Sequence, residues 1–141
     1  MTAARLASIA PCFAVQDPRS TAQWYRERLG FEWAEVYGPA PHHNFFAIVG
    51  RGEMRIMLRF TRDGPGERPW VPDTDQPLFD AYVDTDDVDA LRQEFIANGL
   101  EVEAPVDRIY GMREITVTDP NGYVLIFAQD VAPSELSSTS L

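Results

Sequence analysis

The chain has 141 residues, 45% of them apolar, and this size fits one compact domain with a hydrophobic core. Its 22 acidic residues outnumber 12 basic ones and give a formal net charge of −10, which argues against binding to nucleic acid or to an anionic membrane surface. The charge suits a cationic small molecule, although acidic surfaces also serve solubility. Because Cys12 is the single cysteine and no stretch has the roughly 20 apolar residues of a membrane helix, we expect a cytoplasmic protein.

The first part of the chain predicts a strand, a helix and three further strands. Residues 8–16 alternate in the manner of a strand. Asp17 is a typical helix N-cap, Pro18 suits the first helical position, and Gly30 ends the helix. The next strands are predicted near residues 31–37, 43–49 and 54–60.

Residues 61–76 are rich in proline, glycine and charge, and we interpret them as a linker. The order of elements then repeats, with a turn predicted at 119–122 and a frayed tail at 130–141. The elements expected between these limits are a strand at 77–85, a helix at 87–98, a short strand near 101–103, and strands at 112–118 and 123–129.

The two halves therefore carry the same pattern. Asp87 follows Asp17 by about 70 residues, and Gly99 follows Gly30 at nearly the same spacing, which is typical of a duplicated supersecondary unit. The prediction is an α+β fold in which two βαβββ modules, at about 8–60 and about 77–129, pair into a cupped, mostly antiparallel sheet with the helices on its outer face. Residues 1–141 then form a single domain, and the cup is the expected site.

Five segments of the chain, taken together in this order and spacing, also match a known family. They are Val15-Gln-Asp17, Trp24-Tyr-Arg-Glu-Arg-Leu-Gly-Phe31, Asp86-Asp-Val-Asp-Ala-Leu91, Tyr110-Gly-Met-Arg-Glu114 and Asp119-Pro-Asn-Gly122. In these segments the chain resembles the vicinal oxygen chelate superfamily, which includes glyoxalase I, extradiol dioxygenases and the bleomycin-resistance proteins. The resemblance covers about residues 8–129 and implies the fold, whereas the chemistry depends on the site.

The resemblance also implies where a metal ion would lie. Enzymes of this superfamily hold one divalent metal through His, Glu or Gln at four positions, which correspond here to Ala10, Met57, Asp80 and Ile126. Of these only Asp80 can bind a hard cation, and a catalytic site usually needs three protein ligands. We therefore expect no metal cofactor. The alternative is one divalent ion in an atypical site around His43, Asp80 and Glu114.

Strand parity, anchored on those four positions, predicts which side chains face the cup. They are Cys12, Phe45, Ala47, Arg55, Met57, Arg59, Asp80, Tyr82, Asp84, Met112, Glu114, Thr116, Val124 and Ile126. Acidic groups there can hold a cation, and aromatic rings can stack on a flat ligand. The residues chosen as ligand-binding are Phe45, Arg55, Met57, Arg59, Trp70, Asp80, Tyr82, Met112 and Glu114.

Each of these choices has an ordinary structural alternative. Trp70 can simply pin its loop, and Arg55 and Arg59 can form cross-strand ion pairs. We assign no catalytic residue. Glu114 would be the general base if the protein were an enzyme, and a structural hydrogen-bonding role for it is an equal alternative.

These observations favour a metal-free protein that binds or sequesters an amphipathic and possibly cationic small molecule, similar to the bleomycin-resistance type. The resemblance implies a homodimer. A lyase, isomerase or dioxygenase of the same superfamily, with an atypical metal site or with acid–base chemistry alone, remains an alternative function. A domain that only assembles with a partner enzyme is a third hypothesis, which a cup filled by side chains would favour.

Overall fold

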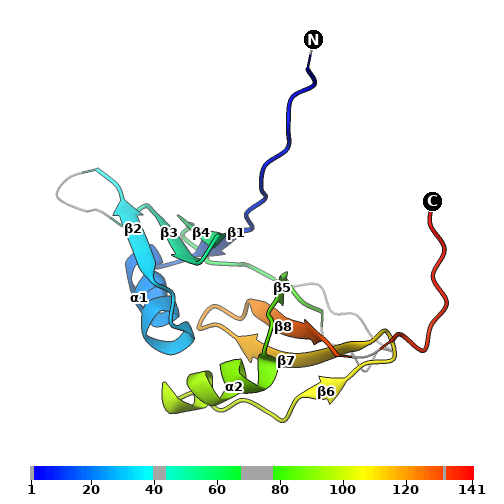
Figure 1. The fold of residues 1–141 in the computed structure, drawn as a ribbon. Coiled ribbons are helices and arrows are strands. Elements are labelled where there is room, and N and C mark those ends of the chain that lie inside the picture. The colour runs from blue at the N-terminus through cyan, green and yellow to red at the C-terminus, as the bar shows by residue number, and fades with distance from the viewer. Residues whose placement is uncertain (1, 40–43, 68–77, 132) are drawn as a thin grey trace.

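The computed structural model describes residues 2–39, 44–67, 78–131 and 133–141 (Figure 1). Two helices and eight strands follow one another in the predicted order, so the α+β fold with two βαβββ modules is confirmed. The elements are β1 (Cys12–Val15), α1 (Pro18–Leu29), β2 (Trp33–Tyr37), β3 (Phe46–Arg51), β4 (Met54–Phe60), β5 (Ala81–Asp84), α2 (Val88–Ala97), β6 (Val106–Asp107), β7 (Met112–Thr118) and β8 (Val124–Asp130).

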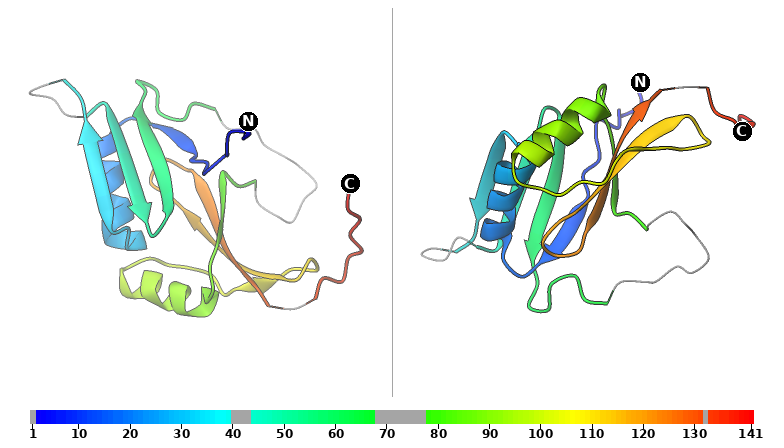
Figure 2. Two further views of the ribbon diagram at one scale, coloured as in Figure 1. Left: turned by 45° about the horizontal axis from the view of Figure 1, so that its top comes forward. Right: turned by 90° about the horizontal axis from the view of Figure 1, so that it is seen from below.

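Each module forms its own four-stranded sheet. Sheet A has the strand order β1-β4-β3-β2 and sheet B the order β5-β8-β7-β6. In both sheets the first strand of the module pairs in parallel with the last, and the other pairs are antiparallel. Within the described residues no strand of one sheet pairs with a strand of the other. Each helix lies against one face of its own sheet, as the left view of Figure 2 shows for α1 behind sheet A.

Both helices begin at an aspartate whose side chain caps the first turn. The Asp17 carboxylate accepts from the backbone N–H of Ser20 at 3.1 Å, and the Asp87 carboxylate accepts from the N–H of Ala90 at 3.0 Å. The helix α1 ends at Gly30, whose left-handed φ of 67° suits glycine. Local sequence therefore sets the helix limits in both modules.

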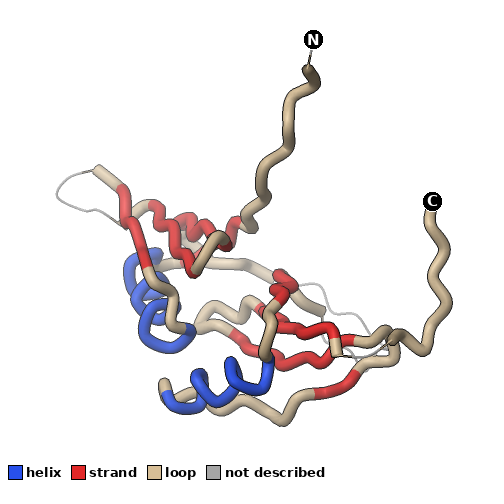
Figure 3. Tube along the Cα trace, viewed as in Figure 1, coloured by secondary structure: helices blue, strands red, loops and turns tan. Residues whose placement is uncertain are grey.

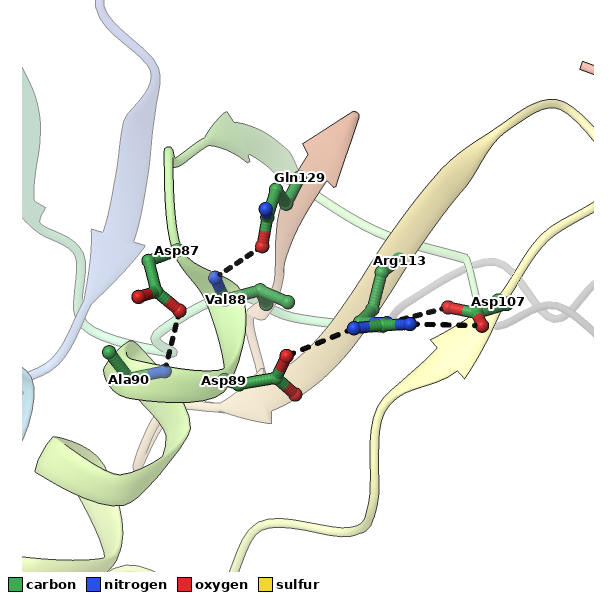
Figure 4. Close-up of polar contacts among 7 residues, drawn as sticks. All are labelled: Asp87, Val88, Asp89, Ala90, Asp107, Arg113 and Gln129. Atoms are coloured by element: carbon green, nitrogen blue, oxygen red, sulfur yellow. Dashed lines mark hydrogen bonds and ion pairs between the residues drawn. The ribbon is translucent and has the colours of Figure 1, made fainter. Parts of the chain in front are cut away.

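Side chains of sheet B hold the start of α2 in place, as Figure 4 shows. The N–H of Val88 donates to Oε1 of Gln129 on β8 at 3.0 Å. Arg113 on β7 contacts Asp89 of the helix at 3.0 Å and Asp107 of β6 at 2.7 Å. These bonds fix the orientation of α2 across its sheet.

One hydrophobic core joins the two modules, because the helix-facing sides of both sheets contribute to it. The turn between β3 and β4 contacts the helix of the other module, where Arg51 pairs with Glu94 at 2.6 Å. In the reciprocal contact, Tyr25 of α1 donates to Asp119 in the turn between β7 and β8 at 2.7 Å. Each module thus places a hairpin turn on the helix of its neighbour.

The prediction of a strand near residues 101–103 is wrong. Residues 101–105 form no strand, and β6 comprises only Val106–Asp107 (Figure 3). The guanidinium group of Arg92 donates to the carbonyl oxygens of Val102 and Glu103 at 2.9 to 3.1 Å. A side chain of α2 therefore binds carbonyls that a strand would have offered to β7.

The other predicted elements agree with the structure apart from their ends. The first strand is shorter than the predicted 8–16, and β5 is shorter than 77–85. Residues 2–11 form no element, and the first part of this segment leads away from the body of the molecule (Figure 1). Leu6 and Ile9 are 98% and 93% exposed.

Candidate functional site

Sheet A has a face turned away from the helices, which we call open face A. Strand pairing places on it Cys12, Trp33, Glu35, Tyr37, Phe46, Ile48, Arg55, Met57 and Arg59. The Trp33 ring lies directly over Gly50, since a Cβ at Gly50 would meet it at 1.9 Å. Most of these side chains are half-buried or exposed, so the face is accessible in the single chain.

The predicted parity is wrong for β3. Ala47 is directly opposite Leu58, and both are fully buried in the core beneath the helix. Phe45 follows the same register, so it lies on the face of sheet A opposite to the one that carries Met57. Its ring centroid is 5.8 Å from that of Phe60. The prediction extended the parity of β4 to β3 by residue number, whereas the hairpin register puts even-numbered residues of β3 beside odd-numbered residues of β4.

Sheet B has a corresponding face, open face B, on which Tyr82, Met112, Glu114, Thr116 and Ile126 lie as predicted. Glu114 is only 2% exposed. Its Oε2 accepts from the hydroxyls of Tyr82 at 2.7 Å and Tyr110 at 2.5 Å, and its Oε1 accepts from Nε of Arg108 at 3.0 Å. We call these four residues, Arg108, Tyr110, Tyr82 and Glu114, the Glu114 group.

A cleft of about 740 Å³ lies at the junction of the modules. It lies between the chain leading into β1, the β3–β4 turn, strand β5 and the start of α2. Three of the predicted ligand-binding residues line it, namely Arg55, Asp80 and Tyr82. Its other lining residues include Ile9, Ala10, Pro11, Phe31, Glu32, Glu53, Met54, Asp84 and Leu91. This combination of apolar walls and a few charged groups is typical of a small-molecule site.

The cleft is more acidic than basic. Glu32, Glu53, Asp80 and Asp84 line it against two bases, Arg51 and Arg55. Arg51 is bound to Glu94, and this hydrogen-bonded pairing raises the pKa of the arginine. The Asp80 carboxylate accepts from the N–H of Val124 at 2.8 Å, which fixes its orientation at the start of β5. A ligand with a positive group is therefore the best electrostatic match.

The remaining predicted site residues lie elsewhere. Met57 and Arg59 are on open face A, and Met112 and Glu114 are on open face B, all outside the lining of the cleft. Trp70 lies outside the described residues, as does His43.

The sequence did not identify Glu32, which precedes β2, or Glu53 and Met54, which lie at the β3–β4 turn, as lining residues of the cleft. The duplication of the modules could have indicated that this turn lies at the junction. Two related modules that share a core bring the turn of each against the other, as Arg51 and Asp119 show.

The residues present do not fit the metal site of the family. Ala10 and Met57 offer no suitable donor for a hard cation, and Ile126 is fully buried. In the atypical set, the oxygens of Glu114 accept from its own group and Glu114 lies outside the cleft that Asp80 lines. Within the described ranges, no group of three or more His, Cys, Asp or Glu side chains is placed to hold a metal.

Several solved structures share this fold. A glyoxalase-related enzyme from Clostridium phytofermentans has a TM-score of 0.71 at 16% identity, over 91% of this chain and 98% of that one. TioX from Micromonospora sp. ML1 has a TM-score of 0.66 at 23% identity, over 89% and 99%. The bleomycin-binding protein from bleomycin-producing Streptomyces verticillus, complexed with copper(II)-bleomycin, has a TM-score of 0.63 at 21% identity, over 89% and 97%.

No curated protein sequence gives a significant match. No helix in the described part of the chain combines the length and apolar character needed to span a bilayer. The model of the Glyoxalase/Bleomycin resistance protein/Dioxygenase superfamily matches residues 5–127, and the chain belongs to this family.

Proposed function

We propose that this protein binds and sequesters an amphipathic small molecule with a cationic group, in the manner of resistance proteins, without a metal cofactor. The acidic cleft carries this proposal, because its carboxylates and apolar walls suit such a ligand. Family relatives that bind bleomycin give the proposal precedent. The donor-poor residues at the metal positions of the family favour binding over metal-assisted chemistry.

We further propose a homodimer in which open face A of one copy faces open face B of the other. Open face A carries Arg55 and Arg59 against one acid, Glu35, whereas open face B carries Asp84 and Asp130, so the balance of these charges is opposite on the two faces. The N-terminal segment leads away from the body (Figure 1), and the same assembly would cover its exposed apolar residues Leu6 and Ile9. Two cups would then form, each with a wall from each copy.

A titration followed by fluorescence tests the binding proposal. The probe is thioflavin T, a flat cationic dye, and metal-free bleomycin is titrated in parallel by calorimetry. We expect saturable dye binding that weakens about tenfold in Asp84→Asn, since this change removes a carboxylate of the cleft. Asp63→Asn makes the same change at an exposed position outside the cleft and should leave the affinity unchanged.

Elemental analysis of the untagged protein tests the metal part of the proposal. About one Mn, Fe, Ni or Zn per chain would contradict it and favour the enzyme alternative. A lack of saturable binding by both probes would reject the cationic ligand class.

A further inference from the structure

A tyrosine from the β7–β8 hairpin closes one junction between the two modules. The Tyr123 hydroxyl accepts from the backbone N–H of Ala14 at 2.8 Å and donates to the C=O of the same residue at 2.9 Å. Ala14 is on β1, an outer strand of sheet A, so the hydroxyl occupies the free edge of this strand. The Tyr123 ring stacks on Phe13 with the ring centroids 4.1 Å apart, and only 7% of Tyr123 is exposed. We call this contact of Tyr123 with Phe13 and Ala14 the closed junction.

The duplication places a second copy of this junction on the other side of the core. Matching the two capping aspartates of the helices aligns β5 with β1, and the parallel pairings then align β8 with β4. In this alignment Asp84 occupies the place of Ala14, and Met54 occupies the place of Tyr123. A thioether has no hydrogen to donate, so Met54 cannot bind the edge of β5 as Tyr123 binds the edge of β1.

The backbone N–H and C=O of Asp84 lie on the free edge of β5. Thr85 donates its N–H to the C=O of Ala128 on β8. Because these groups alternate in direction along a strand, those of Asp84 point away from β8, and none of the described residues bonds to them. All of residues 80–85 line the cleft, so the cleft meets β5 at this edge. The cleft is therefore the open counterpart of the closed junction.

The side chains at the matching positions also leave space for a ring. Val83 takes the place of Phe13, and both Val83 and Met54 line the cleft. The two rings that stack in the closed junction thus correspond to two smaller aliphatic side chains here. Both pack against the core at partly buried positions, so they offer an apolar surface beside the strand edge.

We propose that the cleft binds a phenol, whose hydroxyl binds the N–H and C=O of Asp84 as the Tyr123 hydroxyl binds those of Ala14. This inference rests on the proposed function, since it names the class of ligand for the same cleft. The ligand is an aromatic amine with a phenolic hydroxyl, whose ring lies against Val83 and Met54 and whose positive charge is attracted by the carboxylates of the lining. The hydroxyl provides specificity, because a ligand without it leaves a donor and an acceptor of the strand edge unpaired.

Two probes that differ by one hydroxyl test the class of ligand. Tyramine carries a phenol and an ammonium group, and phenethylamine lacks only the hydroxyl. We expect isothermal titration calorimetry to give about tenfold weaker binding for phenethylamine, because its ring cannot bond to Asp84. Equal affinities would overturn the proposal and leave the cationic ligand class intact.

Met54→Tyr tests the strand edge without a ligand, because it introduces the residue of the closed junction. We expect the new hydroxyl to bind Asp84 and to slow hydrogen exchange of the Asp84 amide about tenfold, as measured by NMR. Met54→Phe has the same ring without the hydroxyl, and it should change this rate less than about twofold. Equal exchange rates in the two variants would overturn the proposal.

Thioflavin T separates a failure of this inference from a failure of the proposed function. If the dye binds the unmodified protein and tyramine does not, the phenol class is wrong and the cationic class stands. If neither probe binds, the proposed function fails as well, and the exchange rates in the two Met54 variants still decide whether the edge of β5 accepts a phenol.

Discussion

The two modules share one plan for their cores and differ on their open faces. In both, a capped helix covers one side of a four-stranded sheet, and the same types of apolar side chain fill the space between. On open face B, Tyr82 and Glu114 close over β8 and bury Ile126. On open face A, Arg55 and Arg59 are both exposed.

This difference shows how a duplicated unit can separate folding from function. The helix-facing sides must remain alike because both modules contribute to one core, whereas the open faces are free to diverge. One face has become a fixed, hydrogen-bonded wall, and the other has remained an accessible surface that carries positive charge. Substitutions in the two modules test where these are equivalent and where they are not.

The reciprocal turn contacts should differ most in their contribution to stability. Asp119 is 4% exposed and accepts from Tyr25 and from the backbone N–H groups of Asn121 and Tyr123. We expect Asp119→Ala to lower the free energy of unfolding by about 3 kcal/mol, because it leaves buried donors without acceptors. Urea denaturation measures this loss.

The matched change in the other contact is Glu94→Ala. The side chain of Glu94 is 40% exposed, and that of its partner Arg51 is 33% exposed. Because an exposed ion pair contributes little, we expect the free energy of unfolding to fall by about 1 kcal/mol or less. Equal losses in the two variants would show that the two turn contacts are equivalent despite their different burial.

Gly50 tests the packing of open face A. A Cβ there would lie 1.9 Å from the Trp33 ring, so Gly50→Ala must displace the indole. We expect a loss of about 2 kcal/mol in stability, together with a changed tryptophan emission spectrum. In a Trp33→Ala background the same substitution should cost less than about 0.5 kcal/mol, because the clash is gone. A full loss in that background would place the cause in the backbone and not in Trp33.

The sequence predicted the cores better than the faces for a physical reason. Helix caps such as Asp17 and Asp87 act within one turn of chain, and apolar alternation marks the buried side of each strand, so both signals are local. The register between β3 and β4 depends on the hairpin turn, and the parity of Phe45 and Ala47 was wrong for that reason.

Contacts between elements explain the other differences between the sequence-based predictions and the structure. Arg92 prevents a strand at 101–105 through bonds from the neighbouring helix, and no local pattern announces them. The sequence pointed to Tyr82 and Arg55 because they lie on strands beside the junction, and to Asp80 because it directly precedes β5. Glu53 is in a turn whose position depends on how the modules pack.

Arg59 tests the proposed complementarity of the two open faces. If open face A of one copy contacts the acidic open face B of another, Arg59→Glu should raise the dimer dissociation constant about tenfold or more, through like-charge repulsion. Analytical ultracentrifugation measures the constant. Arg62→Glu makes the same charge change on an exposed residue beyond β4 and should have little effect. Equal effects of both variants would indicate a response to net charge alone.

The smallest expected effect concerns the cap of α1 and its dependence on pH. The bond from the Ser20 N–H is the main cause that lowers the pKa of Asp17 below its ordinary value of 3.8. A carboxyl group with a lowered native pKa contributes stability above its unfolded value and loses it as the pH falls through the native value. Asp17→Ala should therefore cost about 1 kcal/mol near pH 7 and progressively less below pH 3.8, measured by urea denaturation at each pH. Asp17→Asn keeps the acceptor without the charge, so its cost near pH 7 should be smaller than that of Asp17→Ala and should disappear as Asp17 of the wild type is protonated. If the cost of Asp17→Ala were the same at both ends of the range, the cap would act through its geometry alone.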